Sequence, residues 1–289
     1  MTRCFLLLIA ATTAAHAGHR SERWANAVTT DETIEKSFTV SSSGGAAFDL
    51  DNYYGSIEVI GTSGNQIQVK VAKTIRAASQ ADLEMARSEV VLDVTQDGDS
   101  VKLYVGGPFR CYDDYPDCWR RQKERRYVVH MDFQVRVPER IALRLATVNE
   151  GRVSVENVTG SFKVNNVNGD VTMRNVGGSG EAKTVNGPVK VSFRENPRET
   201  SEFTTVNGDI ELVFAKRPDA DFHFKTWNGD VTSDFPMTAL PAEPAVGERK
   251  DGRFVYRSER YTGGRCGSGG PDVTIQNLNG DIRILESGS

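Results

Sequence analysis

The sequence predicts an all-β protein, a single β-solenoid like a parallel β-helix, in which each coil turns at an Asn-Gly corner. The motif apolar-Asn-Gly-Asp-apolar recurs along the second half of the chain, as in TVNGDIELVF at 205–214. Residues on either side of each corner alternate between apolar and polar, the period-two pattern of strands with one buried face. Related copies of the motif stand at 165–173, 183–191, 225–233 and 276–284.

The spacing of the repeats predicts that the coils stack. Glycines recur nine residues apart from Gly151 to Gly187, and then stand at Gly208 and Gly229, 21 residues apart. A lone coil of ~20 residues buries about five apolar side chains worth roughly 1.5–3 kcal/mol each, whereas ordering its backbone costs roughly 1–2 kcal/mol per residue. Coils must therefore share inward faces and pair their strands. An antiparallel barrel or sandwich is the alternative, but the common phase of the Asn-Gly pairs favours parallel coils.

The alternation also predicts which side chains face the core. In the coil of TVNGDIELVF the inward set is Phe203, Val206, Ile210 and Leu212. Trp227 occupies the position of Val206 in its own coil, so it is predicted to be a core residue rather than a binding aromatic. An aspartate at position 206 should accordingly unfold the protein, because it would bury an unpaired charge.

The first half of the chain is less regular but follows the same logic. Residues 79–89 form the one convincing helix, which Ser79 can cap, with Asp82 three residues on in the manner of a capping box. The remaining predicted elements are a strand-corner-strand unit at 48–61, a strand at 66–75, a hairpin at 90–105 that turns at 96–99, and a strand at 127–138.

We expect one continuous domain from 29 to 286, since no linker interrupts the pattern. Residues 18–28 would form an N-terminal tail. The segment 235–271, rich in Pro and Gly, enlarges the last repeat gap and is predicted to be an inserted loop or hairpin.

Residues 1–17 are typical of a secretory signal peptide. Arg3 gives a short positive region, an apolar run follows, and Ala15-His16-Ala17 is a small-residue cleavage site. We expect cleavage after Ala17 and an exported product in the periplasm, at the cell surface or outside the cell. No later segment has 18 consecutive apolar residues, so no transmembrane helix is expected.

The net charge of the exported chain argues against binding to nucleic acid. Residues 1–17 contain one basic and no acidic residue, so 34 basic and 39 acidic residues would remain after cleavage. The resulting net charge of −5 gives no electrostatic attraction to a phosphate backbone.

The cysteines of the exported chain predict one disulfide. Cys111 and Cys118 form the close pair for a disulfide, whose eight-residue loop would stabilise by roughly 2.5 kcal/mol. Cys266 is then odd, and it is either free or paired with one of the other two.

The ordered motifs resemble a known family. They are the unit DNYYGSIEV at 51–59, a short helix followed by a hairpin, a strand ending in Val137-Pro138, and the series of TVNGD units. This order is similar to the bacterial putative adhesin family, an exported β-strand-repeat domain of unknown function. The resemblance covers roughly 34–286. It implies a β-helix-like fold and an envelope or extracellular location, and it supplies no catalytic residues.

No motif in the chain indicates catalysis, a cofactor or a metal site. G-x-S-x-G, HExxH and phosphate-loop motifs are missing from the sequence. Asp170, Asp209 and Asp230 could in principle ligate calcium or form a glycosidase pair, but a repeated Asp is better explained by its corner. We therefore expect a protein that is not an enzyme. A carbohydrate-active β-helix enzyme is the alternative, and a purely structural envelope component is a third possibility.

The loop 109–126 is the least repetitive part of the chain and the candidate binding site. A disulfide-closed loop with exposed aromatic rings suits contact with an envelope or extracellular glycan or protein. The alternative is that this segment is a hairpin without a binding role, in which the acidic and basic side chains neutralise one another. The candidate binding residues are Tyr112, Tyr115, Trp119, Arg120 and Arg121.

Overall fold

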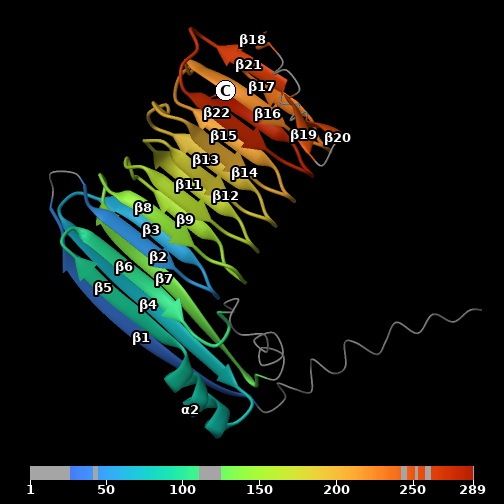
Figure 1. Cartoon of the computed structure of the whole chain (residues 1–289). Coiled ribbons are helices and arrows are strands. Elements are labelled where there is room, and N and C mark those ends of the chain that lie inside the picture. The colour runs from blue at the N-terminus through green and yellow to red at the C-terminus, as the bar shows by residue number, and fades with distance from the viewer. Residues whose placement is uncertain are drawn as a thin grey trace, which may run out of the picture. The chain divides into compact units, whose positions relative to one another are not determined.

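The computed structural model describes residues 27–41, 45–110, 125–241, 246–250, 253–257 and 262–288 (Figure 1). The chain divides into two compact units. The smaller unit comprises 74–91 and 107–129 together with the N-terminal segment to Asp31, and the larger unit comprises 32–73, 92–106 and 130–289.

The strands form two large open sheets and one separate hairpin. The first sheet has the order β1 (Val28–Thr39), β4 (Gln66–Ala77), β7 (Tyr127–Pro138), β3 (Ile57–Thr62), β9 (Val153–Glu156), β11 (Val171–Val176), β13 (Val189–Phe193), β15 (Ile210–Phe214), β23 (Ile282–Glu286), β17 (Val231–Ser233). The second sheet has the order β18 (Met237–Ala239), β21 (Thr262–Cys266), β16 (Ala220–Lys225), β22 (Asp272–Gln276), β14 (Ser201–Thr204), β12 (Gly180–Lys183), β10 (Phe162–Asn165), β8 (Ala142–Ala146), β2 (Ala47–Asp51), β6 (Ser100–Gly106), β5 (Val91–Asp97). The hairpin pairs β19 (Val246–Lys250) with β20 (Arg253–Arg257).

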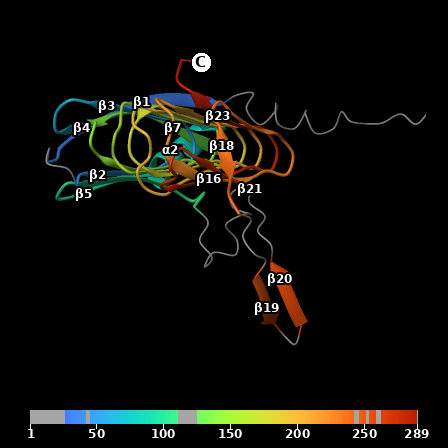
Figure 2. The same cartoon turned by 90° about the horizontal axis from the view of Figure 1, so that it is seen from above.

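Within the larger unit, the chain passes from one sheet to the other and back, so the fold is all-β and solenoid-like. Figure 2 shows the two sheets as two layers, with β3 and β23 in one and β2 and β16 in the other. The core lies between these layers. Phe203, Ile210, Leu212 and Phe214 are each fully buried, and the ring of Phe214 stacks on that of Phe193 at 5.1 Å between centroids. The inward assignment of Phe203, Ile210 and Leu212 is thereby confirmed.

The inward assignment of Val206 and Trp227 is wrong. Val206 is only half-buried, and Trp227 is 66% exposed. The buried residue of this corner is Thr205, at 2% exposure. Its hydroxyl donates a hydrogen bond to the carbonyl oxygen of Gly187 in the neighbouring coil at 2.8 Å, so a polar side chain is satisfied in the interior.

Asparagine side chains connect the corners of successive coils. After the first coil, the Nδ2 group of each asparagine donates to the Oδ1 atom of the asparagine in the preceding coil of the stack at 2.8–2.9 Å. We call this row the asparagine ladder, and it runs through Asn149, Asn168, Asn186, Asn207, Asn279 and Asn228. The glycine after each asparagine permits the close approach of the coils. At Gly208, for example, an added Cβ atom would stand 2.2 Å from the carbonyl oxygen of Gly187.

The C-terminal coil does not stack in sequence order. Its strands β22 and β23 lie between β14–β15 on one side and β16–β17 on the other, with parallel pairing throughout. The segment 235–271 makes this return possible, since β21 runs antiparallel to both β16 and β18. The predicted insertion is therefore a connection that carries the chain back to fill a gap in the stack. Its Cys266 is a buried free thiol, and burial raises the pKa of that thiol.

The smaller unit holds helix α2 (Gln80–Glu89), as the sequence predicts. Ser79 caps the helix by accepting a hydrogen bond from the backbone N–H of Asp82 at 3.2 Å. The hydroxyl of Tyr127 donates to the carboxylate of Glu89, and burial, reinforced by this bond, raises the pKa of Tyr127. The guanidinium of Arg125 lies 5.7 Å from the ring centroids of both Phe109 and Tyr127.

Candidate functional site: the outer face of the first sheet

The binding residues expected in the loop lie outside the described part of the chain. Tyr112, Tyr115, Trp119, Arg120, Arg121 and the cysteine pair Cys111 and Cys118 all fall within 111–124. The structure therefore places none of them, and a candidate site is sought among the described residues of the larger unit.

The outer face of the first sheet carries two hollows in that unit. One hollow of about 700 Å³ lies over β1, β4, β7 and β3, and a second of about 790 Å³ lies over β7, β3, β9, β11 and β13. Glu58 and Gln134 line both. We call the two hollows together the face groove.

The strand alternation places polar side chains in the face groove. On β7, Phe133 and Val135 are buried while Gln134 and Arg136 are exposed, because successive side chains point to opposite faces. The parallel register then aligns polar residues of separate strands in one row. This row runs Gln134, Glu58, Ser154, Thr172, Lys190.

Several cations of the face groove have no acidic partner. Within the described ranges, none of Arg136, Arg152, Arg174 and Lys190 makes an ion pair. Glu58 and Asp170 contribute carboxylates to the same surface, so it carries both signs of charge. These guanidinium, amide and carboxylate groups are available to donate and accept hydrogen bonds from a ligand.

The outer face of the second sheet is different, because its charges pair across the strands. Lys183 contacts Glu202 at 2.8 Å and Glu181 at 3.4 Å, and Lys163 contacts Glu181 at 3.1 Å. The hydrogen bond from Lys163, followed by the nearby Lys183, lowers the pKa of Glu181. Because these charged side chains already pair with one another, the second sheet offers fewer unpaired charged groups to a partner than the face groove does.

A row of apolar side chains follows the asparagine ladder on the outside of the corners. Leu278 is 39% exposed, Val185 is 38% exposed, and the ring of Trp227 lies 5.3 Å from the ammonium of Lys225. The row includes Val206 and Trp227, which the sequence pattern wrongly predicts to be core residues. The signal that could have found it is the Thr or Asn just before each apolar residue, which takes the inward position instead.

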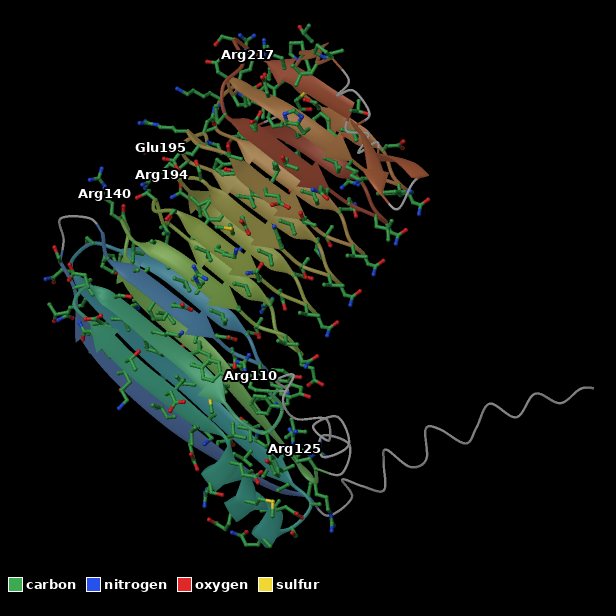
Figure 3. The ribbon with its side chains drawn as sticks, in the orientation of Figure 1. Arg110, Arg125, Arg140, Arg194, Glu195 and Arg217 are labelled. Atoms are coloured by element: carbon green, nitrogen blue, oxygen red, sulfur yellow. The ribbon has the colours of Figure 1, made fainter. Side chains whose placement is uncertain are left out.

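The opposite corners carry exposed arginines. Figure 3 shows Arg140, Arg194 and Arg217 projecting from the same edge of the coils. Arg194 lies 3.8 Å from Glu139, which partly neutralises this edge. Arg194 is therefore less available to a ligand than the cations of the face groove, which make no ion pair among the described residues.

Neither a cluster of metal-ligand side chains nor a membrane-spanning helix is found among the described residues. No three His, Cys, Asp or Glu side chains among them gather as metal ligands would. No helix in the same ranges is long and apolar enough to cross a membrane.

Comparison with known proteins gives one family match and several similar solved structures. Residues 51–285 match the family model described as Toastrack DUF4097. The fold is similar to a putative cell adhesion protein from Clostridium sporogenes, with 12% identity, 89% of this chain and 100% of that chain covered, and a TM-score of 0.34. It is also similar to a putative adhesin from Bacteroides fragilis, with 10% identity, 88% and 97% covered, and a TM-score of 0.37. A third structure is a putative lipid binding protein from Parabacteroides distasonis, with 8% identity, 89% and 95% covered, and a TM-score of 0.27.

No curated protein is significantly similar in sequence to this chain. The family match confirms the resemblance to the putative adhesin family that the ordered motifs indicate. Because the matched residues 51–285 make up most of the sequence, the chain belongs to the Toastrack DUF4097 family.

Proposed function

We propose that this protein is an exported, non-catalytic binding module that holds an envelope or extracellular glycan or protein in the face groove. The observation that carries the proposal is the set of unpaired polar side chains, such as Arg136 and Gln134, on a stiff sheet. A groove that offers donors and acceptors of both charge signs suits a ligand that is rich in hydroxyl or amide groups.

The proposal includes a single domain over 29–286 whose coils turn at Asn-Gly corners. It also includes removal of the signal peptide 1–17 and a short tail at 18–28, which would place the domain in the periplasm, at the cell surface or outside the cell. Export is tested by N-terminal sequencing of the secreted product, which should begin at Gly18.

We further propose that the loop 109–126 adds a second contact. A Cys111–Cys118 disulfide would close it, and Tyr112, Tyr115, Trp119, Arg120 and Arg121 would supply rings and guanidinium groups to the partner. The sequence composition of the loop supports this assignment.

A glycan array with the full chain tests the proposed function. Wild type should bind a defined set of glycans, and Arg136→Ala should weaken binding at least about tenfold, which corresponds to about 1.4 kcal/mol. The matched control is Arg144→Ala on the second sheet, whose side chain lies 3.8 Å from Asp49 and outside the face groove. Trp119→Ala tests the loop separately.

A cleavage assay on the bound polymers and a binding assay with envelope proteins distinguish the rival functions. Cleavage of a bound polymer that is lost in Asp209→Asn or Asp230→Asn would establish a carbohydrate-active enzyme instead. Absence of binding to every glycan and to envelope proteins would favour a purely structural role.

A further inference from the structure

In the described part of the chain, the first sheet ends at β17. In the inner coils, the N–H group two residues after the corner glycine donates to the next coil. Examples are the N–H of Ile210 to the carbonyl of Asp281 at 2.8 Å, and that of Ile282 to the carbonyl of Asp230 at 2.9 Å. Val231 holds the equivalent position in β17, and no further strand follows it in the described part of this sheet. Its N–H group therefore faces outward.

Two side-chain ladders also end at this coil with open acceptors. Asn228 donates to Asn279 at 2.8 Å, and within the described residues nothing donates to the Oδ1 atom of Asn228. In the coil before, the carboxylate of Asp281 accepts from the backbone N–H of Asp230 at 3.2 Å. Asp230 has no such donor among the described residues. Its carboxylate could therefore accept a hydrogen bond from a backbone N–H group of an added strand.

An inner ladder of hydrogen bonds is incomplete within the last coil. In other coils the Thr or Asn before the apolar corner residue donates to a glycine carbonyl of the adjacent coil, as Asn277 does to Gly208 at 2.8 Å. The hydroxyl oxygen of Thr226 is buried and has no hydrogen-bond partner among the described residues. By the direction of this row its partner would be the carbonyl of Gly280 in the preceding coil, so this gap lies inside the stack and does not mark its open end. The backbone edge and the two side-chain ladders together mark the position of a further coil that none of the described residues supplies.

A hollow of about 400 Å³ with a mixed lining, which includes Lys225, Thr226 and Thr262, lies beside β17. Its lining also includes Phe224, Val231, Met237 and Ala239. Val231 is 40% exposed although its equivalents Ile210 and Ile282 are fully buried. In the inner coils the inward side chains of the next coil fill this space, and here the hollow is large enough to accept apolar side chains from an added strand.

We propose that the edge of β17 accepts an extended peptide strand from a partner protein as one more parallel strand of the first sheet. The peptide would carry the coil pattern of Thr or Asn, an apolar residue, Asn, Gly, any residue and an apolar residue. Its Asn would donate to Asn228, its backbone would accept from Val231, and its apolar side chains would enter the hollow. A glycan cannot supply this alternating backbone register, so the occupant is a polypeptide.

The test uses the full chain and a fluorescent synthetic peptide with the sequence of Asp272–Glu286, read by anisotropy. Saturable one-to-one binding is expected. Val231→Pro should weaken it at least about tenfold, because proline removes the outward N–H, and it is tolerated on an edge strand. A peptide carrying Gly280→Ala should fail to bind, since in the stack a Cβ atom at Gly280 would stand 2.3 Å from the carbonyl oxygen of Gly208.

Hydrogen exchange keeps the proposal testable if Val231→Pro does not fold. In wild type, the peptide should slow exchange of the Gly229 and Val231 amides. The proposal is overturned if no peptide binds, if the Gly280→Ala peptide binds equally well, or if those two amides stay unprotected. Displacement of the native β22–β23 segment by the peptide would likewise contradict it, since that outcome is strand exchange within the stack.

Discussion

The side-chain amide of Asn207 donates to the side-chain carbonyl of Asn186 at 2.8 Å, and its own carbonyl accepts from Asn279 at the same distance. Asn186 precedes Asn207 by 21 residues in the sequence, whereas Asn279 follows it by 72 residues. The corner motif therefore connects neighbouring coils as well as turning the backbone.

Removing one member of the asparagine ladder should weaken the stack. Asn207→Ala breaks two hydrogen bonds, each worth roughly 0.5–1.5 kcal/mol, so the free energy of unfolding should fall by about 1–3 kcal/mol. Chemical denaturation measures the change. Thr204→Ala on the adjoining strand is the control, and an equal loss in both variants would argue against a specific role for the ladder.

The corrected orientation of the corner makes a paired prediction. Thr205→Val keeps the shape but leaves the carbonyl of Gly187 without its donor, so stability should drop by about 1–3 kcal/mol. Val206→Asp changes a half-buried, outward side chain, and it should cost less than about 1 kcal/mol. Thermal melts of both variants check the order, and a larger loss in Val206→Asp would restore the original inward assignment.

The alternation of side chains predicts the buried residues within each strand, but the prediction for the corner residues is wrong. Period-two alternation identified Phe203 and Ile210 as core residues because each lies within a regular strand. Continued from Phe203, the alternation places Thr205 inward and Val206 outward, and its phase changes only between Val206 and Ile210. A threonine reads as a surface residue in the sequence, and only the three-dimensional stack reveals the glycine carbonyl that satisfies its hydroxyl.

The stacking order of the coils could not be predicted from the sequence either. All coils carry nearly the same motif, so the sequence does not say which coil lies beside which. The face groove depends on that order, since Gln134, Glu58 and Ser154 meet only because β3 lies between β7 and β9. The sequence could therefore predict a solenoid-like fold but not the surface that it displays.

The insertion of the C-terminal coil can be tested with engineered cysteines. Glu211 and Arg283 are register partners on adjacent strands, and strand neighbours lie about 4.8 Å apart, within disulfide reach. Glu211→Cys with Arg283→Cys should therefore cross-link under mild oxidation, as read by peptide mapping.

The matched control combines Glu211→Cys with Thr232→Cys. Thr232 pairs with Arg283 on the far side of β23, two strand spacings from Glu211. Efficient cross-linking of this control pair, with none in the first pair, would mean that the coils stack in sequence order.

The ion pair between Asp221 and Arg265 predicts a pH dependence of stability. Arg265 contacts both carboxylate oxygens of Asp221, at 2.7 and 2.6 Å, and this hydrogen bonding lowers the pKa of Asp221 below its ordinary value of 3.8. The stabilisation is thus fully present above about pH 4. It is lost as the pH falls through the lower pKa of the folded state.

Unfolding curves of wild type and Asp221→Asn between pH 7 and pH 2 measure this effect. The stability difference between the two proteins should be constant at neutral pH and shrink in acid. Arg265→Gln should flatten the same part of the wild-type curve. A difference that stays constant down to pH 2 would show that the pair does not bias the titration of Asp221.

The most direct test of the binding account is to locate the ligand by hydrogen exchange of the full chain, with and without the best ligand from the array. The account predicts slower exchange in the face groove, at residues 58–60, 134–136 and 152–154, and little change on the second sheet around Lys163 and Lys183. Protection confined to the second sheet, or absent from the face groove at saturating ligand, would contradict it.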